Sequence, residues 1–211
     1  LAASDFTTPL TLFALDLNVM ELTVMRRQPQ QFDSDGINVQ QFWTTSADGE
    51  RIPYFHVGKN ATPDTPTLVY AYGGFGIPEL PHYLGSVGKY WLEEGNAFVL
   101  ANIRGGGEFG PRWHQAAQGI SKHKSVDDLL AVVRDLSERG MSSPKHIGLQ
   151  GGSNGGLITA AAFVREPQSI GALVCEVPLT DMIRYPLLSA GSSWTDEYGN
   201  PQKYEVCKRW L

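Results

Sequence analysis

The sequence is poor in cysteine, has no surplus of positive charge and contains no long apolar run. Two cysteines in 211 residues are too few for a disulfide framework. Cys175, inside an apolar run, is predicted to be a buried core thiol. The 17 basic residues are outnumbered by 22 acidic ones and form no cluster, which argues against a nucleic-acid partner. No stretch reaches the roughly 18 apolar residues that cross a bilayer, so no membrane partner is expected either.

The first residues contain no basic region followed by an apolar core, so no secretory signal is visible. The first residue is Leu1 rather than Met, and we therefore expect the natural start to lie upstream. A cytoplasmic location is favoured, with a periplasmic or secreted one as the alternatives. No cysteine and histidine cluster with ligand spacing occurs, so neither a metal nor a cofactor is expected.

Apolar strand-like segments alternate with helical segments from about residue 37 onward. The expected strands are 39–45, 51–57, 67–72, 97–103, 146–150 and 172–177, and the expected helices are 83–94, 125–139 and 154–165. Asp48-Gly49 predicts a hairpin between the first two strands. This order predicts an α/β fold with a mostly parallel sheet and helices on both faces, opened by an antiparallel hairpin as in α/β-hydrolases.

Two local patterns refine this prediction. In the helix 125–139, Ser125 with Asp128 is typical of a capping box, and Gly140 is typical of a helix end. The N-terminal segment does not fit the hydrolase plan. Residues 9–17 alternate as in one or two strands, and the polar residues 26–31, which include a proline, predict a linker. We therefore expect the first residues to belong to a neighbouring module.

A strand ending at Gln150, then Gly-Gly-Ser-Asn-Gly, then a helix, matches the G-x-S-x-G nucleophile elbow in its required context. The serine of such an elbow sits on a tight, strained turn, where side chains two residues away on either side would collide; Gly151 and Gly155 satisfy that requirement. A phosphate-binding loop would need a lysine, which is absent here. Ser153 is therefore predicted to be an exposed nucleophile, with the dipole of the following helix favouring developing negative charge.

Two further glycine runs accompany the elbow. The oxyanion hole is expected to use the backbone N–H of Asn154 and a second donor from residues 70–76, Tyr-Ala-Tyr-Gly-Gly-Phe-Gly. An ordinary glycine turn is the alternative for that loop. Residues 102–110 form another run, but its spacing does not make G-x-G-x-x-G at the start of a helix. It predicts a close-packed loop beside the active site rather than a nucleotide site.

The triad of this fold runs Ser, then Asp or Glu, then His, and this order cannot be completed here. All five histidines precede Ser153, and no carboxylate after it is followed by a histidine. The chain also ends after the sixth expected hydrolase strand, where two more would carry the acid and the base. We therefore expect a fragment that lacks the triad Asp and His, with His114 or His123 as a non-standard base being the alternative.

Several ordered motifs resemble the prolyl oligopeptidase family of serine peptidases. They are Tyr-Ala-Tyr-Gly-Gly-Phe at 70–75, Ala-Asn-Ile-Arg-Gly-Gly-Gly-Glu-Phe-Gly at 101–110, Trp-His at 113–114, Gly-Gly-Ser-Asn-Gly-Gly at 151–156, and the segments 177–182 and 193–199. Family members place a seven-bladed β-propeller before the hydrolase domain. The resemblance implies that residues 1–28 are the remnant of the last propeller blade, 29–36 a linker and 37–211 a truncated hydrolase domain.

The resemblance also implies a role for each matching position. Ser153 matches the nucleophile, and the Tyr72 hydroxyl with the Asn154 N–H matches the oxyanion hole. The implied proline pocket uses Trp194, Phe75, Leu179 and Tyr198. An indole face suits a flat apolar proline ring, although without the resemblance Trp194 would be assigned to core packing.

Some positions depart from the family pattern or separate its groups. Leu179 stands where members often carry valine, so the pocket shape is expected to differ slightly. The arginine that binds the substrate backbone in the family is expected beyond Leu211. The related oligopeptidase B group, specific for basic residues, usually has Arg-Ser-Ala around its serine. Gly152-Ser153-Asn154, together with Trp194, favours prolyl specificity instead.

The elbow predicts acyl transfer through Ser153, and the resemblance implies a serine-type endopeptidase or oligopeptidase that cleaves short peptides after proline. Its other expected partner is the remainder of its own chain. Another α/β-hydrolase activity, such as an aminoacyl peptidase or a carboxylesterase, is one alternative. A non-catalytic fragment that acts by binding is the other, and without the triad acid and base we expect the 211 residues alone to have negligible peptidase activity.

Overall fold

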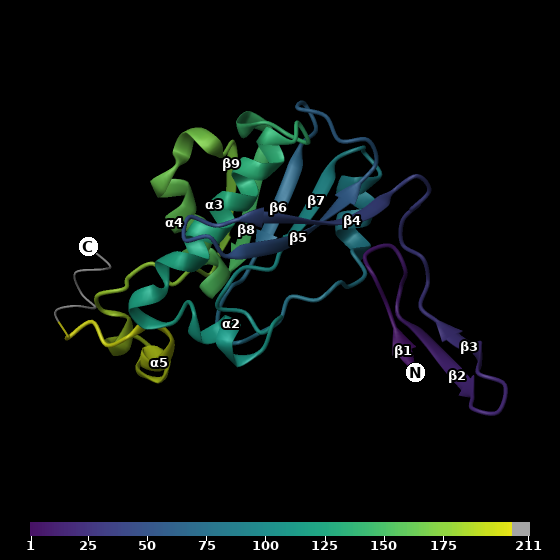
Figure 1. Cartoon of the computed structure of the whole chain (residues 1–211), viewed down its shortest axis with the longest axis horizontal. Helices are drawn as coiled ribbons and strands as arrows, with labels where there is room; N and C mark the ends of the chain where they lie inside the picture. The colour runs from purple at the N-terminus through teal and green to yellow at the C-terminus, as the bar shows by residue number, and fades with distance from the viewer. Residues whose placement is uncertain (204–211) are drawn as a thin grey trace.

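The computed structural model describes residues 1–203, so Cys207 lies outside the described range. These residues form a large mixed sheet with helices on both faces and a small three-stranded sheet at the N-terminal end (Figure 1). Every expected strand of the large sheet is present, with bounds that differ by a few residues at most.

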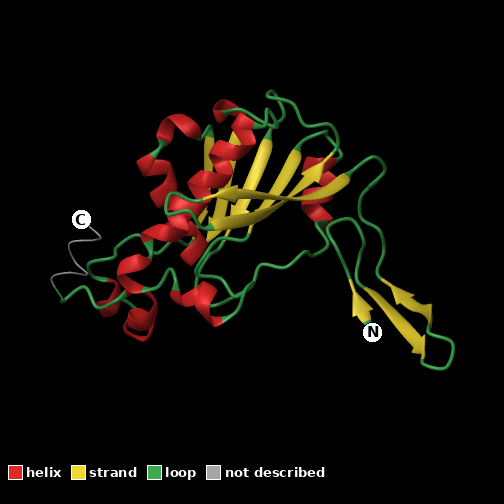
Figure 2. Ribbon diagram, in the orientation of Figure 1, coloured by secondary structure: helices red, strands yellow, loops and turns green. Residues whose placement is uncertain are grey.

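The large sheet has six strands in the order β4-β5-β7-β6-β8-β9. Figure 2 shows this sheet in yellow with the helices in red. Their bounds are β4 Asn38–Thr45, β5 Arg51–Gly58, β6 Thr67–Ala71, β7 Ala97–Ala101, β8 Ile147–Gly152 and β9 Ala172–Glu176. β4 and β5 form the predicted antiparallel hairpin, β5 pairs antiparallel with β7, and the remaining pairs are parallel. The prediction of a mostly parallel sheet opened by a hairpin is confirmed.

Both faces of this sheet are covered by apolar cores. On one face, α3 (His123–Glu138) and α4 (Asn154–Arg165) pack against residues such as Val99 and Leu149. On the other, α1 (Gly85–Val87) runs into the π-turn η1 (Gly88–Leu92) and packs against Phe98 and Leu100. Successive residues of a strand point to opposite faces, and the wholly apolar β7 can therefore supply both cores.

The prediction of a capping box at Ser125 is wrong. Helix α3 begins two residues earlier, at His123. The Ser125 hydroxyl donates to the carbonyl of Arg104 at 2.7 Å, and the Asp128 carboxylate accepts from the Arg104 side chain. Both polar side chains are fully buried. They form hydrogen bonds with Arg104 in a distant loop and do not cap the first turn of their own helix.

Cys175 is only partly buried, contrary to the prediction of a core thiol. It lies on β9, which is an edge strand among the described residues, so one side of its neighbourhood is not packed. Its thiol donates to the carbonyl of Gly156 at 3.3 Å, and burial raises its pKa. The geometry assigns no reactive character to this cysteine.

The N-terminal sheet is formed by β1 (Ala2–Ala3), β2 (Thr11–Asp16) and β3 (Glu21–Arg27). β3 therefore includes the first two of the polar residues 26–31 that predicted a linker, and it ends before the linker 29–36 implied by the resemblance. Much of the apolar surface of this sheet is exposed, including Leu12, Leu22, Val24 and Met25. The loop between β1 and β2 is different, because Phe6 is 1% exposed and its ring centroid lies 5.4 Å from that of Phe55 on β5 of the large sheet.

The other helical elements are short. They are α2 (Pro111–Gln115), η2 (Gly119–Ser121), η3 (Pro144–His146), η4 (Pro167–Ser169), η5 (Tyr185–Leu187), η6 (Gly191–Trp194) and α5 (Thr195–Tyr198). The expected helix at 83–94 is the pair α1 and η1, which together are shorter than predicted. Within residues 1–203, no helix has the length and apolar character needed to cross a membrane.

One buried side chain predicts a pH dependence of stability. His56 on β5 is 4% exposed, and its Nε2 atom has no hydrogen-bond partner among the described residues. Burial lowers the pKa of His56 from 6.5 to about 4. Between these values the unfolded chain binds the extra proton and the native state does not. Above pH about 6.5 the protonation of His56 has no effect on the free energy of unfolding. Below that pH, the free energy of unfolding falls by about 1.4 kcal/mol per pH unit until the pH reaches about 4.

Urea unfolding of the wild type, His56→Phe and His123→Phe across that range checks this expectation. His56→Phe should show a shallower loss of unfolding free energy on acidification. The exposed His123 serves as the control, and its variant should keep the wild-type slope. Equal slopes for all three proteins would contradict the assignment of the pH dependence to His56.

Candidate active site

Ser153 occupies a sharp turn between the end of β8 and the first residue of α4. Its backbone angles, φ 53° and ψ −116°, lie in a region that non-glycine residues rarely adopt. Its N–H donates to the carbonyl of Glu176 at 2.9 Å, which ties the turn to the end of β9. The residue is exposed, whereas its neighbour Asn154 is fully buried. The strand, strained turn and helix that the motif predicts are therefore present.

The two glycines flanking this turn have no room for a side chain. A Cβ on Gly151 would collide with the carbonyl of Gly155, and a Cβ on Gly155 would collide with the carbonyl of Ala71 at the end of β6. The collisions confirm the predicted reason for glycine at both positions, namely that a side chain would not fit there. It also shows that the elbow is pressed directly against the residues that precede Tyr72.

The carboxyl ends of the parallel strands meet at this edge of the sheet and build a pocket. Tyr72 follows β6, Ser153 follows β8 and Val177 follows β9. The pocket has a volume of about 350 Å³ and is lined by Tyr72, Phe75, Ile77, Ser153, Val177, Leu179, Trp194 and Tyr198. The volume lies at the lower end of the roughly 300–1,000 Å³ typical of small-molecule sites. Six of the seven predicted site residues therefore line one cavity.

The seventh predicted residue, Asn154, lies beneath the pocket and connects two of its walls. Its side-chain Nδ2 donates to the backbone carbonyl of Tyr72 at 2.5 Å, and its Oδ1 accepts from the hydroxyl of Tyr198 at 3.1 Å. Its backbone N–H is in the first turn of α4, where N–H groups have no acceptor within the helix. That N–H is therefore suited to bind an external anionic oxygen.

The Tyr72 hydroxyl is suited to donate a hydrogen bond at neutral pH. Burial raises the pKa of Tyr72, and the carboxylates of Glu197 and Glu79 raise it further. The side chain is half-buried and faces the cavity that also contains Ser153. A phenol that keeps its proton can donate to negative charge developing on a substrate oxygen.

Aromatic rings form one wall of the pocket. The rings of Phe75 and Tyr198 meet edge to face, with centroids 5.7 Å apart and an interplanar angle of 85°. Tyr185 also meets Tyr198 edge to face, with centroids 5.5 Å apart. Trp194 ends η6 immediately before α5 and packs on the same cluster. Such pairs add stability beyond their buried area, and they give the pocket a stiff apolar surface.

The glycine run at 102–110 packs against the loop that follows Tyr72, as predicted. Gly76 N–H donates to the carbonyl of Gly105 at 3.0 Å, and a Cβ on Gly105 would collide with the carbonyl of Gly73. Arg104 anchors the run through a buried ion pair with Asp128 at 2.6 Å and a second pair with Asp48 at 2.7 Å. This loop is a support for the site.

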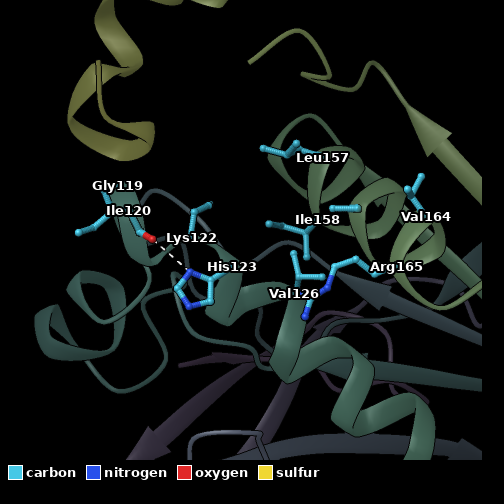
Figure 3. Close-up of a pocket in the computed structure, with 10 residues that line it drawn as sticks. Gly119, Ile120, Lys122, His123, Val126, Leu157, Ile158, Val164 and Arg165 are labelled. Carbon is cyan, nitrogen blue, oxygen red and sulfur yellow. Dashed lines mark hydrogen bonds between the residues drawn. The ribbon is translucent and has the colours of Figure 1, made fainter. Parts of the chain in front are cut away.

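Neither histidine that could serve as an alternative base lines the Ser153 pocket. Among the described residues, His114 forms a 2.7 Å hydrogen bond with Glu197, and His123 bonds the carbonyl of Ile120 at 3.1 Å. His123 instead lines a separate cavity of about 370 Å³ between α3 and α4 (Figure 3). The part of the chain that the structure describes also contains no cluster of three or more side chains that could hold a metal ion.

Sequence reasoning missed two lining residues and a buried cluster. Ile77 and Val177 line the pocket, but neither carries a chemical signature that distinguishes it from core residues. The missed cluster consists of Lys122, Glu197 and His114 behind the aromatic wall. Lys122 and Glu197 are 75 positions apart in the sequence, so no local pattern could have paired them.

Comparisons with known proteins agree with this geometry. The sequence model of the protein family described as the prolyl oligopeptidase family matches residues 84–210. A protein of Sinorhizobium fredii named peptidase y4nA is 45% identical over 202 residues, which are 94% of this chain and 28% of that protein. A prolyl endopeptidase of Elizabethkingia meningoseptica is 31% identical over 202 residues, again 94% of this chain and 28% of the relative.

A solved structure gives the same result for the fold. The post-proline cleaving enzyme from Rickettsia typhi superposes with a TM-score of 0.92 at 39% identity, covering 99% of this chain and 30% of that one. The chain thus spans less than a third of the length of these relatives. The family match covers more than half of the chain, and the fold and the elbow agree with it. The chain belongs to the prolyl oligopeptidase family of peptidases and has the α/β-hydrolase fold.

Proposed function

We propose that this chain carries the nucleophile and the substrate pocket of a serine peptidase that cleaves short peptides after proline. The observation that carries the proposal is the exposed, strained Ser153 in the same cavity as Tyr72 and the aromatic wall. Relatives named prolyl endopeptidase and post-proline cleaving enzyme support the choice of substrate. A proline ring would enter the apolar end of the pocket and lie against Trp194.

The proposed reaction is acyl transfer in two steps. The Ser153 Oγ attacks the carbonyl carbon of the substrate proline, and the oxygen of that carbonyl becomes negatively charged. The Asn154 N–H and the Tyr72 hydroxyl donate to that oxygen. Collapse of the tetrahedral intermediate expels the amine and leaves the acyl group on Ser153, which water then releases as the peptide acid.

This chemistry needs a base that accepts the Ser153 proton and returns it to the leaving amine. No histidine follows Ser153 in the 211 residues, and in the α/β-hydrolase order both the acid and the base follow the serine. We therefore propose that the triad Asp and His are not among residues 1–211. Functional tests accordingly use the protein expressed from its complete coding sequence.

We also propose that residues 1–28 are the end of the last blade of a β-propeller, that 29–36 are a linker and that 37–211 belong to the hydrolase domain. The exposed apolar faces of β2 and β3 support this proposal, because an isolated three-stranded sheet rarely leaves such surface open to water. The rest of the same protein would cover that surface.

Trp194→Ala tests the proposed specificity. Three substrates are compared: a chromogenic peptide with proline before the scissile bond, the same peptide with alanine there, and a simple ester. The wild type should prefer the prolyl peptide. Loss of the indole should lower kcat/KM for that peptide about 10- to 100-fold, which corresponds to roughly 1.5–3 kcal/mol of lost apolar contact. Hydrolysis of the ester should change little, because the ester does not use the proline pocket.

Trp43→Ala is the matched control. Trp43 is also partly exposed and packs against another aromatic ring, Phe109, but it lies outside the Ser153 pocket. Its variant should keep the wild-type preference for proline. A wild type that hydrolyses the ester but not the prolyl peptide would favour a carboxylesterase instead.

A further inference from the structure

A buried ionic cluster lies behind the aromatic wall of the pocket. Lys122, between η2 and α3, is 1% exposed, and Glu197, on α5, is 3% exposed. Their Nζ and Oε1 atoms are 2.6 Å apart, and the second carboxylate oxygen, Oε2, lies 2.7 Å from Nε2 of His114 on α2. Three separate elements thus meet at one carboxylate.

The cluster holds the two walls of the pocket. Lys122 Nζ also donates to the carbonyl of Gly73 at 3.0 Å, and Gly73 directly follows Tyr72. Glu197 lies in the helix turn between Trp194 and Tyr198, and the backbone of Phe75 stabilises its carboxylate. The Lys122 ammonium additionally lies 5.6 Å from the centre of the Tyr198 ring. One ion pair therefore links the proposed oxyanion donor to the proposed proline pocket.

Buried charges of this kind are costly unless they are fully paired. Burial alone would raise the pKa of Glu197, but the Lys122 charge and the hydrogen bond from His114 outweigh it, so the pKa lies below its usual value. The carboxylate is therefore ionised at neutral pH. A pair of apolar residues could fill the same space without this cost, so a contribution to stability does not explain the pair by itself.

We propose that Lys122 and Glu197 are positioning residues of the active site. Their ion pair fixes the carbonyl of Gly73, and with it the Tyr72 hydroxyl, relative to α5, which carries Tyr198 and directly follows Trp194. This inference rests on the proposed function, since it assigns to these residues the task of aligning the oxyanion hole with the bound proline. Neither residue lines the Ser153 pocket, so both act on that pocket through their neighbours.

A double-mutant comparison separates positioning from stability. Lys122→Met and Glu197→Gln each leave one buried charge without its partner, so both single variants should be less stable. The double variant Lys122→Met with Glu197→Gln removes both charges and should recover much of the lost unfolding free energy. It should nevertheless keep kcat about 10- to 100-fold below wild type on the prolyl peptide. The Gly73 carbonyl has then lost the Lys122 donor and keeps only the longer hydrogen bond from the Ser125 hydroxyl at 3.4 Å, and small misplacements are amplified in rate.

The control is Lys89→Met with Glu93→Gln, which removes an exposed Lys–Glu pair of similar length, 2.7 Å. This control should keep the wild-type kcat. His114→Ala provides a second, milder variant if the double variant does not fold. It leaves the buried pair intact, removes one hydrogen bond from Glu197, and should raise KM for the prolyl peptide several-fold. An unchanged KM in a folded His114→Ala protein would count against the positioning role.

The outcomes also distinguish this inference from the proposed function. A double variant that recovers both stability and kcat would overturn the positioning role while leaving the peptidase assignment intact. A wild type that hydrolyses only the ester would overturn proline specificity, and the ester kcat of the double variant would still test the link from Lys122 to Tyr72. Amide hydrogen exchange over residues 72–76 gives a readout without turnover: it should be faster in the double variant, and unchanged exchange would contradict the inference.

Discussion

Replacing Ser153 by alanine is expected to lower kcat about a million-fold on a prolyl peptide. Loss of the equivalent serine costs about that much in a well-studied serine protease, because no other group forms the covalent intermediate. Binding of the substrate should survive, since the aromatic pocket is unchanged. Initial rates for kcat, and displacement of a fluorescent prolyl peptide for affinity, check the two halves of this expectation.

Ser137→Ala is the control for this experiment. Ser137 lies on α3, outside the pocket, and its hydroxyl donates to the carbonyl of Val133. The control variant should retain the wild-type rate. If Ser153→Ala retained more than a small fraction of the activity, another nucleophile would have to be found and the elbow would lose its proposed role.

Tyr72→Phe is expected to lower kcat about 100- to 1,000-fold and to leave KM nearly unchanged. Removing one oxyanion donor has an effect of this size, about 2.7–4 kcal/mol, because the hydrogen bond is made mainly in the transition state. The ring itself remains, so the pocket keeps its shape. Steady-state kinetics on the prolyl peptide and on the simple ester measure the effect, which should be similar for both substrates.

Tyr70→Phe is the matched control, since it removes a hydroxyl two residues earlier. Tyr70 packs against the core on the other face of the sheet and does not line the pocket. Its variant should have the wild-type kcat. Equal losses for the two tyrosines would indicate a general disturbance of β6, and no loss for Tyr72→Phe would contradict its proposed part in the oxyanion hole.

The elements that could be predicted from the sequence are those whose causes are local. The turn at Ser153 depends on glycines at 151 and 155, and the alternation of apolar strands and helices depends on residues within each segment. The start of α3 was predicted wrongly because Ser125 and Asp128 bond to Arg104, which lies 21 and 24 residues away. These two residues are polar because of their contacts with Arg104, which lies too far away in the sequence for a local pattern to reveal.

The site could be predicted only in part for the same reason. The seven predicted site residues came from the elbow motif and from the family resemblance, and six of them line one pocket. Ile77 and Val177 were missed because the sequence does not distinguish an apolar loop residue that lines a pocket from one that packs in the core. Cys175 was predicted to be buried because its neighbours are apolar, but strand order, which places β9 at the edge among the described residues, is a property of the whole fold.

The position of Phe6 has a mechanical consequence. Its ring lies among aromatic residues of the large domain, and the carbonyl of Phe6 accepts a hydrogen bond from the N–H of Leu84 at 3.2 Å. The loop between β1 and β2 therefore fastens the small sheet to the large one through Phe6. The chain itself passes from one sheet to the other only after β3. A version of the protein that begins at residue 29 would leave an empty apolar socket of the kind that costs about 3–5 kcal/mol when a buried phenylalanine is removed.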